Sequence, residues 1–300
     1  MLFDTHAHVN FNAFKDDADE VIKKSLENET WMINVGSQYS TSQRAVEYAD
    51  AYAGVHPHTK NGSQVVLNDT KSSGFGVGVY ASVGLHPIHI KDEDFDYDKY
   101  LELAKSEKVV AIGEMGLDYH HFDPPRLAET ASRREAGVGD SVKELKAKQK
   151  EVFEKAIDLA NQVNKPLIVH CWDAYDDLLE ILSNKEVIKK GVIHSFIGSH
   201  KTARKFVNLG FKIGLNGIIT YSESYDKLIR ELSLEDIVLE TDCPYLTPQP
   251  LSREERNEPI NTKYVAEKIS RVREMEIPEV IKVTTQNARK VFTPLNPRTH

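Results

Sequence analysis

Residues 166–183, PLIVHCWDAYDDLLEILS, contain the structural unit that is repeated through most of this chain. Its first part, PLIVH, is short, apolar and rich in Val and Ile, which is typical of a strand buried on both faces. The segment DAYDDLLEILS that follows carries its apolar residues at helical spacing. A polar residue, His170, stands at the end of the strand. The stretch therefore predicts one β-strand followed by one α-helix.

The same unit recurs along nearly the whole chain of 300 residues. Strand candidates occupy residues 1–6, 31–36, 80–84, 109–114, 166–170, 191–196, 211–216 and 236–242. Amphipathic segments lie between them, and the clearest of these extends from 141 to 163. This alternation predicts a parallel (β/α)8 TIM barrel of the α/β class rather than an open sheet. We expect a single domain over residues 1–300, because a barrel with loop insertions fills this length.

Two stretches interrupt the alternation, near residues 54–78 and 120–140. The first is polar and rich in Gly and Ser, and it joins a helix to a strand, so it belongs at the bottom of a barrel. The second follows the fourth strand and belongs at the top face, where barrels carry out their chemistry. One insertion is therefore expected to be structural, and the other to shape the active site.

Composition limits the class of protein. Hydrophobic residues make up 40% and charged residues 28%, which is ordinary for a globular protein. The net charge of −8 argues against wrapping of nucleic acid by a basic surface, but a local site in which metal ions supply positive charge is compatible with it. No apolar run is long enough to cross a membrane, and the N-terminus lacks the regions of a secretion signal. With only Cys171 and Cys243, we expect a reduced, cytoplasmic protein without a membrane partner.

Histidine and carboxylate side chains stand at the ends of several predicted strands: His6, His8, Glu114, His170, His194 and Asp242. In a parallel barrel all those ends converge on one rim. Alone, such a histidine is more commonly a hydrogen-bonded structural residue, and a buried carboxylate is usually half of an ion pair. Together, buried without a cation, they would leave one another unsatisfied. The combination therefore predicts a metal centre.

The number of ligands exceeds what one tetrahedral zinc ion needs, so we expect two divalent ions. Glu114 can bridge them, because a carboxylate offers two oxygens. The expected division is His6, His8 and Asp242 on one ion, and His170 and His194 on the other. Asp242 is the first candidate to orient or deprotonate the attacking water, and Glu114 is the second. Imidazoles suit Zn²⁺ or Mn²⁺ whereas Mg²⁺ prefers oxygen ligands, so the choice among these three ions stays open.

The motifs that contain these residues resemble those of the TatD-related deoxyribonuclease family. They are DTHAH (4–8), VGLHP (83–87), GEMGLDY (113–119), PLIVH (166–170), GVIHSFIG (191–198), LETDCPYL (239–246), RNEP (256–259) and TTQNARKVF (284–292). The resemblance implies a TIM-barrel hydrolase of the amidohydrolase superfamily, with 3′→5′ exonuclease-like or another DNase activity often supported by Mg²⁺. It carries the ligand roles onto the six residues already named, and it implicates His86 in contacting substrate phosphate. It also places Glu240 near the metals, either acting directly or as the hydrogen-bond partner of a ligand.

The chain departs from the family pattern at a few positions. GVHPH at 54–58 imitates VGLHP, but no apolar run precedes it, and the spacing to Glu114 assigns the motif to His86. Asn10 stands where many relatives carry Asp, and Ser195 replaces a common Cys. Neither position is a ligand in this interpretation, so the predicted metal site is unaffected.

The helix entry after the sixth strand has two interpretations. Ser199 is a reasonable N-cap for the helix that contains Lys201 and Arg204. The free backbone amides of the same helix could equally hold a phosphate at the rim.

The leading hypothesis is a metal-dependent phosphodiesterase that acts on DNA, a deoxyribonuclease that trims 3′ ends as a monomer. A deacylase or amidase acting on an acylated nucleotide or tRNA would use the same ligands. A metal-stabilised barrel that binds a partner without turnover is a third hypothesis, and the intact ligand set argues against it.

Overall fold

Eight parallel strands form one sheet in the order of the chain. The computed structural model describes residues 1–53, 78–122 and 138–292. The strands are β1 Leu2–Ala7, β2 Thr30–Val35, β3 Val79–Val83, β4 Val109–Asp118, β5 Leu167–Trp172, β6 Gly191–Ile193, β7 Lys212–Leu215 and β8 Ile237–Leu239. Nearly all of their residues are buried, and every strand except β1 contains Val or Ile, as expected for strands covered on both faces.

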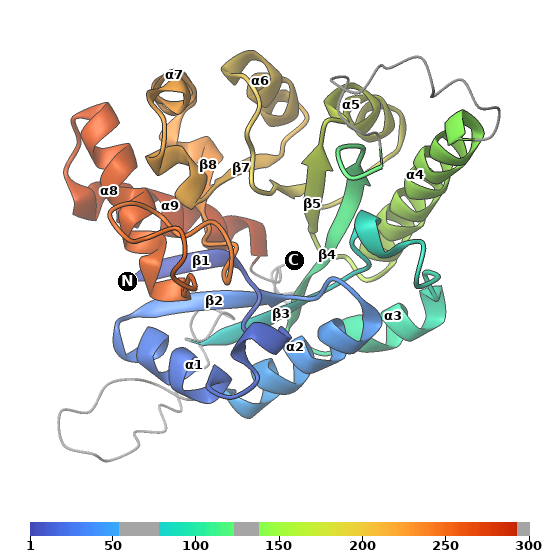
Figure 1. Cartoon of the computed structure of the whole chain (residues 1–300), viewed down its shortest axis with the longest axis horizontal. Helices are drawn as coiled ribbons and strands as arrows, with labels where there is room; N and C mark the ends of the chain where they lie inside the picture. The colour runs from blue at the N-terminus through green and yellow to red at the C-terminus, as the bar shows by residue number, and fades with distance from the viewer. Residues whose placement is uncertain (54–77, 123–137, 293–300) are drawn as a thin grey trace, which may run out of the picture.

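Helices alternate with the strands and lie around the outside of the sheet (Figure 1). The α-helices are α1 Ala18–Glu27, α2 Tyr39–Ala51, α3 Tyr97–Ala104, α4 Val138–Gln162, α5 Tyr175–Asn184, α6 His200–Asn208, α7 Asp226–Glu231, α8 Thr262–Arg273 and α9 Ile277–Phe292. Short 3-10 helices are η1 Asn12–Phe14, η2 Pro87–His89, η5 Gly217–Thr220, η6 Glu223–Tyr225, η7 Leu234–Asp236 and η8 Pro259–Asn261. None of the described helices is long and apolar enough to cross a membrane.

The sheet closes on itself between β1 and the segment that follows β8. The backbone N–H of Asp242 donates to the carbonyl of His6 at 2.8 Å, and that of His8 donates to the carbonyl of Cys243 at 2.9 Å. These bonds satisfy edge groups that an open sheet would expose. The predicted (β/α)8 barrel is therefore confirmed, and its closing seam passes through three of the predicted ligands.

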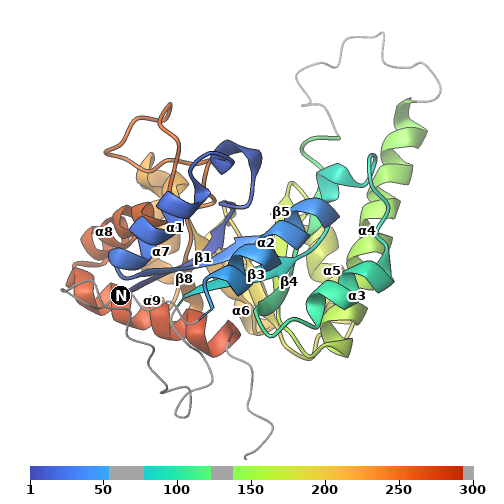
Figure 2. The same ribbon diagram turned by 90° about the horizontal axis from the view of Figure 1, so that it is seen from below.

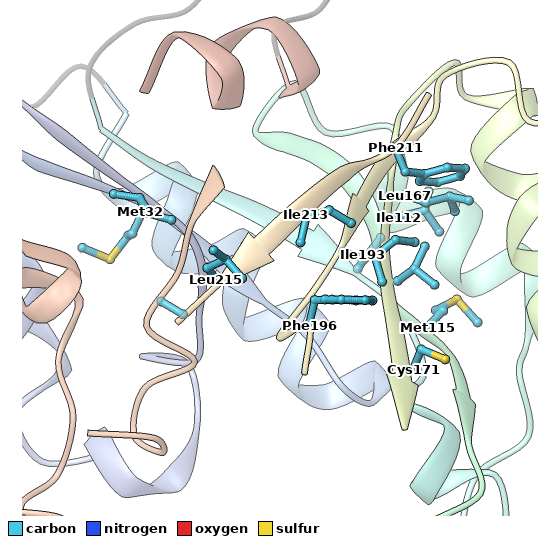
Figure 3. Packing of buried hydrophobic residues seen from close by; sticks show 14 of the residues in the cluster. Met32, Ile112, Met115, Leu167, Cys171, Ile193, Phe196, Phe211, Ile213 and Leu215 are labelled. Carbon is cyan, nitrogen blue, oxygen red and sulfur yellow. The ribbon is translucent and has the colours of Figure 1, made fainter. Parts of the chain in front are cut away.

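Alternation along the strands divides the apolar core into two clusters. Trp31 and Ile33 of β2 belong to a cluster that α9 completes with Ala288 and Phe292, while Met32 belongs to the larger cluster that packs against the helices. Figure 3 shows part of the larger cluster, to which several strands contribute side chains, among them Met32, Ile112, Leu167, Ile193 and Ile213. In Figure 2, α9 lies beside β1 and β8. Ile168 and Val192 of the first cluster stand two residues before His170 and His194, so this cluster lies on the strand face that carries the predicted ligands, inside the barrel.

All eight predicted strands are present, but the prediction that Glu114 ends the fourth strand is wrong. β4 continues for four more residues, because the run from Met115 to Asp118 pairs with β5. Gly116 permits this close pairing: it has φ 150°, and a Cβ there would lie 2.0 Å from the carbonyl oxygen of His170. Glu114 therefore projects from within the strand, and Asp118 stands at its end.

The two insertions near 54–78 and 120–140 fall mostly outside the described residues, and so does the GVHPH segment. Their flanks have the expected order, since one lies between α2 and β3 and the other between β4 and α4. The roles assigned to them, and the extent of a single domain over 1–300, stay predictions.

Candidate metal centre

The predicted ligands gather at the carboxyl ends of the strands, around a cavity of about 460 Å³. Their placement follows from strand alternation, because Ile168 and Val192 point into the barrel interior and His170 and His194 stand two residues further on. His8, Glu114 and Asp242 also line the cavity, and His6 lies fully buried beside them. The structure therefore brings all six predicted ligands together.

Glu114 occupies the middle of this group. Its Oε2 lies 3.4 Å from His6 Nε2 and 3.8 Å from His8 Nε2. Its Oε1 lies 2.8 Å from His170 Nδ1 and 3.2 Å from His194 Nε2. The two oxygens of one carboxylate thus face two separate pairs of imidazoles, which is the arrangement that a bridging ligand needs.

The first side of the centre contains His6, His8 and Asp242. Asp242 Oδ1 lies 3.3 Å from His8 Nε2 and 3.7 Å from His6 Nε2. His8 Nδ1 lies 2.8 Å from the carbonyl oxygen of Val35, so that nitrogen carries the ring proton and Nε2 is free to bind a cation. Asp242 has φ 58°, a left-handed conformation that is uncommon outside Gly, Asn and Asp and frequent at functional sites.

The second side contains His170 and His194, and a carboxylate supports each ring. His170 Nε2 lies 3.1 Å from Asp118 Oδ2, and His194 Nδ1 lies 3.2 Å from Glu240 Oε2. Glu240 Oε2 also accepts a 2.9 Å hydrogen bond from the backbone of Ser195. Of the two roles left open for Glu240, the contacts favour that of hydrogen-bond partner to a ligand.

The electrostatics of the buried group fit a divalent cation. Burial opposes the charge of Glu114, yet the neighbouring histidines His86, His194 and His6 hold its pKa well below the usual range. Burial likewise opposes protonation of His194, yet Glu114, Glu240 and Asp242 raise its pKa well above the usual range. These carboxylates therefore depend on positive charge that the imidazoles supply only by taking up protons. A metal ion supplies the same charge and uses the imidazole nitrogens as ligands.

Unpartnered atoms and donor spacing support the same conclusion. Among the described residues, His6 Nδ1 and Glu240 Oε1 are buried without a hydrogen-bond partner. His6 Nε2 and His8 Nε2 lie only 3.1 Å apart, which a shared cation would accommodate. Four groups of three side chains place their ligand atoms within 4.8 Å of one another: His6, His8, Glu114; Glu114, His170, His194; His6, His194, Glu240; and His86, Asp118, His170. The chain thus presents a metal-binding centre.

His86 lies at the cavity wall beside Glu114, with its Nε2 3.3 Å from Glu114 Oε1. Its Nδ1 accepts a 3.2 Å hydrogen bond from the backbone N–H of Ile88, so the ring proton is on Nε2. Burial lowers the pKa of His86 to about 4. The residue therefore presents a neutral N–H donor to the cavity.

The remaining walls come from residues that the sequence analysis did not single out as site residues. Aromatic and aliphatic side chains line the cavity around the ligands: Phe11, Ile88, Trp172, Ile197, Ile218, Tyr245 and Leu246. Phe11 stacks on the His8 ring at 4.2 Å between centroids, and Tyr245 is 55% exposed. No Lys or Arg of the described part of the chain lines this cavity. These side chains come from separate segments, which is why local sequence pattern did not reveal them.

One polar residue of the site, Asp118, was also missed. Asp118 is fully buried, and His121 Nδ1 donates to its Oδ2 at 2.8 Å. Alternation could have found Asp118, since residues 114, 116 and 118 share one face of a strand that is long enough. The predicted strand ended at Glu114 and so left Asp118 in a loop.

Ser199, which lies between β6 and α6, is the N-cap of α6. Ser199 Oγ accepts a 3.1 Å hydrogen bond from the backbone N–H of Thr202, at the start of α6. Ser199 does not line the cavity. Of the two interpretations of this segment, the hydrogen bond from Thr202 supports helix capping.

Comparison with known proteins agrees with the resemblance seen in the motifs. A family model described as TatD related DNase matches residues 3–293. The uncharacterized metal-dependent hydrolase YabD of Bacillus subtilis (strain 168) is 35% identical over 300 residues, covering 97% of this chain and 99% of its own length. The human deoxyribonuclease TATDN3 is 29% identical over 304 residues, covering 98% of this chain and 95% of its own. The crystal structure of YjjV, a TatD homolog from Escherichia coli K12, has the same fold, with a TM-score of 0.76 at 24% identity over 98% of both chains. The chain therefore belongs to the TatD related DNase family of metal-dependent hydrolases.

Proposed function

We propose that the chain is a deoxyribonuclease that hydrolyses phosphodiester bonds at 3′ ends of DNA. The observation that carries the proposal is the position of Glu114, whose two oxygens face His6 and His8 on one side and His170 and His194 on the other. This arrangement suits two adjacent divalent ions. Such ions would lower the pKa of an attacking water and offset charge on the attacking and leaving oxygens of the ester.

Asp242 is proposed as the residue that orients the water and accepts its proton. Its Oδ1 faces the first histidine pair, and its side chain is 16% exposed at the cavity. The adjacent histidines lower its pKa against the effect of burial, so the carboxylate is ionised and able to accept a proton. Glu114 is the alternative base, although its two oxygens are engaged with four imidazoles.

His86 is proposed as the group that holds the substrate phosphate. Its Nε2–H is the donor, because Ile88 occupies Nδ1, and the low pKa keeps the ring neutral at physiological pH. The apolar and aromatic walls suit the base and sugar of a terminal nucleotide, since base–aromatic stacking tolerates any sequence. The name of the human relative TATDN3, a deoxyribonuclease, supports this choice of substrate.

A second candidate keeps the same centre and changes the bond that is cleaved. A deacylase or amidase acting on an acylated nucleotide or tRNA would place its acyl group against the apolar wall. The absence of Lys and Arg from the described lining of the cavity favours a less charged substrate than a DNA backbone. The name of YabD specifies a metal-dependent hydrolase and is compatible with either bond.

A substrate panel separates the two candidates. The protein is loaded with Mn²⁺, Mg²⁺ or Zn²⁺ in turn and offered 3′-labelled single-stranded DNA, duplex DNA, RNA and aminoacyl-tRNA. We expect release of mononucleotides from the 3′ end of DNA, with single-stranded DNA the better substrate. Asp242→Asn with its metal content verified is the control for a contaminating nuclease. Release of amino acid from aminoacyl-tRNA with intact DNA would replace the proposal by the second candidate.

The expected monomer and cytoplasmic location belong to the same proposal. Sedimentation velocity of the metal-loaded protein tests the first, and fractionation of the source cells tests the second.

A further inference from the structure

We propose that Asp118 is a positioning residue of the metal centre, which orients His170 so that its Nδ1 serves as the ligand beside Glu114. The proposal rests on the two-ion centre of the proposed function and is independent of the substrate. Asp118 is fully buried at the end of β4, next to the paired residue Trp172 of β5.

The His170 ring has a carboxylate oxygen on both sides. Nδ1 lies 2.8 Å from Glu114 Oε1, and Nε2 lies 3.1 Å from Asp118 Oδ2. A neutral imidazole has one N–H and can donate to only one of these oxygens. With a cation beside Nδ1 and Glu114, the single proton stays on Nε2 and donates to Asp118. The carboxylate therefore selects the tautomer and the ring orientation that metal binding needs.

Asp118 is itself held from three directions. Its Oδ1 accepts a 3.0 Å hydrogen bond from the backbone N–H of His121, and its Oδ2 accepts one of 2.8 Å from His121 Nδ1. The side-chain amide of Gln149 bonds both the N–H and the carbonyl of Asp118, each at 2.9 Å. These bonds fix the orientation of the carboxylate, and its contact with Nε2 in turn orients the His170 ring.

The other ligand on this side has the same kind of support. His194 Nδ1 lies 3.2 Å from Glu240 Oε2, and the opposite nitrogen faces Glu114 Oε1 at 3.2 Å. His170 and His194 thus both face Glu114 with one ring nitrogen. With the other nitrogen, each faces a second carboxylate of its own, Asp118 or Glu240. This repetition indicates that the contact of Asp118 is part of how the centre is built.

A competing assignment uses Asp118 as a metal ligand. Ligand atoms of His86, Asp118 and His170 lie within 4.8 Å of one another, which would suit a third ion. However, His86 Nε2 is 3.3 Å from Glu114 Oε1, and both Asp118 oxygens already accept hydrogen bonds from His121. The contacts favour the positioning role, and metal stoichiometry distinguishes the two.

The test is calorimetric titration of metal-free protein with Mn²⁺, in the absence of any nucleic acid. In the wild type we expect two ions per chain. Asp118→Ala should raise the dissociation constant of one ion by about 10- to 100-fold and leave the other unchanged. Asp118→Asn keeps an acceptor for His170 but loses the charge, so its effect should be smaller. Because no substrate is present, failure of the proposed DNase activity would not affect the result.

His120 and His121 provide a matched pair. Both are exposed histidines of the same loop, with an Nδ1 to carboxylate distance of 2.8 Å, but His120 contacts Asp173 whereas His121 contacts Asp118. His121→Ala should weaken the same ion as Asp118→Ala, by less, and His120→Ala should weaken neither. The proposal is overturned by unchanged dissociation constants in Asp118→Ala and His121→Ala, or by three ions in the wild type that become two in Asp118→Ala. If Asp118→Ala does not fold, Asp118→Asn and His121→Ala distinguish the same outcomes.

Discussion

The two sides of the candidate metal centre hold their histidines in different ways. On the first side, His8 is oriented by a backbone carbonyl, and His6 Nδ1 has no hydrogen-bond partner among the described residues. On the second side, a buried carboxylate faces the outer nitrogen of His170, and another faces that of His194. On the first side the only ring held by such a bond, His8, is thus held by the backbone, whereas both rings of the second side face a carboxylate side chain.

This difference follows from where each side lies in the barrel. The first side stands at the closing seam, where backbone hydrogen bonds join His6 to Asp242 and His8 to Cys243. The second side stands at the ends of β5 and β6, away from that seam, and its rings face carboxylate side chains instead. A carboxylate partner also makes an imidazole a stronger ligand than a carbonyl partner does. Substitutions should therefore be able to weaken the second side without changing the first.

The largest effect is expected for Glu114→Ala, because Glu114 is the residue that both sides share. Its loss removes a ligand oxygen from each pair of histidines, so both ions should bind more weakly. Metal content under saturating Mn²⁺, about two ions per chain in the wild type by analogy with two-metal centres, is the measurement. A wild-type value of one, or a variant that loses only one ion, would show that Glu114 serves one side alone.

The next largest effect is expected for Asp242→Asn on the first side. The amide keeps the size of the side chain and one oxygen, but it cannot accept a proton, so kcat should fall by about 10² to 10⁴. Steady-state kinetics on a short 3′-labelled DNA, with metal content measured in the same samples, tests this. His86→Ala is the contrasting variant and should mainly raise KM. Near wild-type kcat in fully metallated Asp242→Asn would make Asp242 a ligand only and Glu114 the candidate base.

A smaller and one-sided effect is expected for Gly214→Ala. A Cβ at Gly214 would lie 2.1 Å from Glu240 Oε1, so the Glu240 carboxylate must shift, and its contact with His194 should be disturbed. We expect a loss of stability of about 1–3 kcal/mol from the crowding. In addition, one ion should bind about 10-fold more weakly, as for the loss of a ligand's partner. Gly210→Ala is the control for lost stability alone, since its φ of 93° disfavours Ala but the added Cβ would meet only the Lys190 side chain. If Gly214→Ala weakened the binding of both ions equally, the two sides would not be supported independently.

The smallest effect is expected for Ser195→Cys, which restores the residue common in relatives. Glu240 receives its hydrogen bond from the backbone N–H of Ser195, and this bond does not depend on the side chain. The Oγ accepts from Asn216 Nδ2, at 2.8 Å, so its loss should lower the free energy of unfolding by about 1 kcal/mol. Metal affinity should stay unchanged. Denaturant unfolding and Mn²⁺ titration measure the two quantities, and a clear loss of metal would mean that the hydroxyl supports the second side.

Some features of the site were predictable because they depend on local pattern. His170 and His194 each follow an interior apolar residue by two positions, so alternation places them at the rim once the strands are recognised. Asp118 was missed because a strand's end depends on its partner: β4 continues only where β5 pairs with it, and Gly116 permits that close approach. The apolar walls were missed because Phe11, Trp172 and Tyr245 come from three separate segments.

The eight strand–helix units, the (β/α)8 barrel and the convergence of six ligand-type side chains on one rim could all be inferred from the amino-acid sequence. These follow from short-range periodicity, which the strand geometry converts directly into a buried face and an end. Three properties became visible only in the folded chain: which nitrogen of each imidazole faces the centre, the contact of Glu240 with His194, and the place of Asp118 in the site. Those properties depend on distances of about 3 Å between groups far apart in the chain, and hydrogen bonds lose their strength over a few tenths of an ångström. Periodicity selects a face of a strand, and packing between strands selects the partner that each atom meets there.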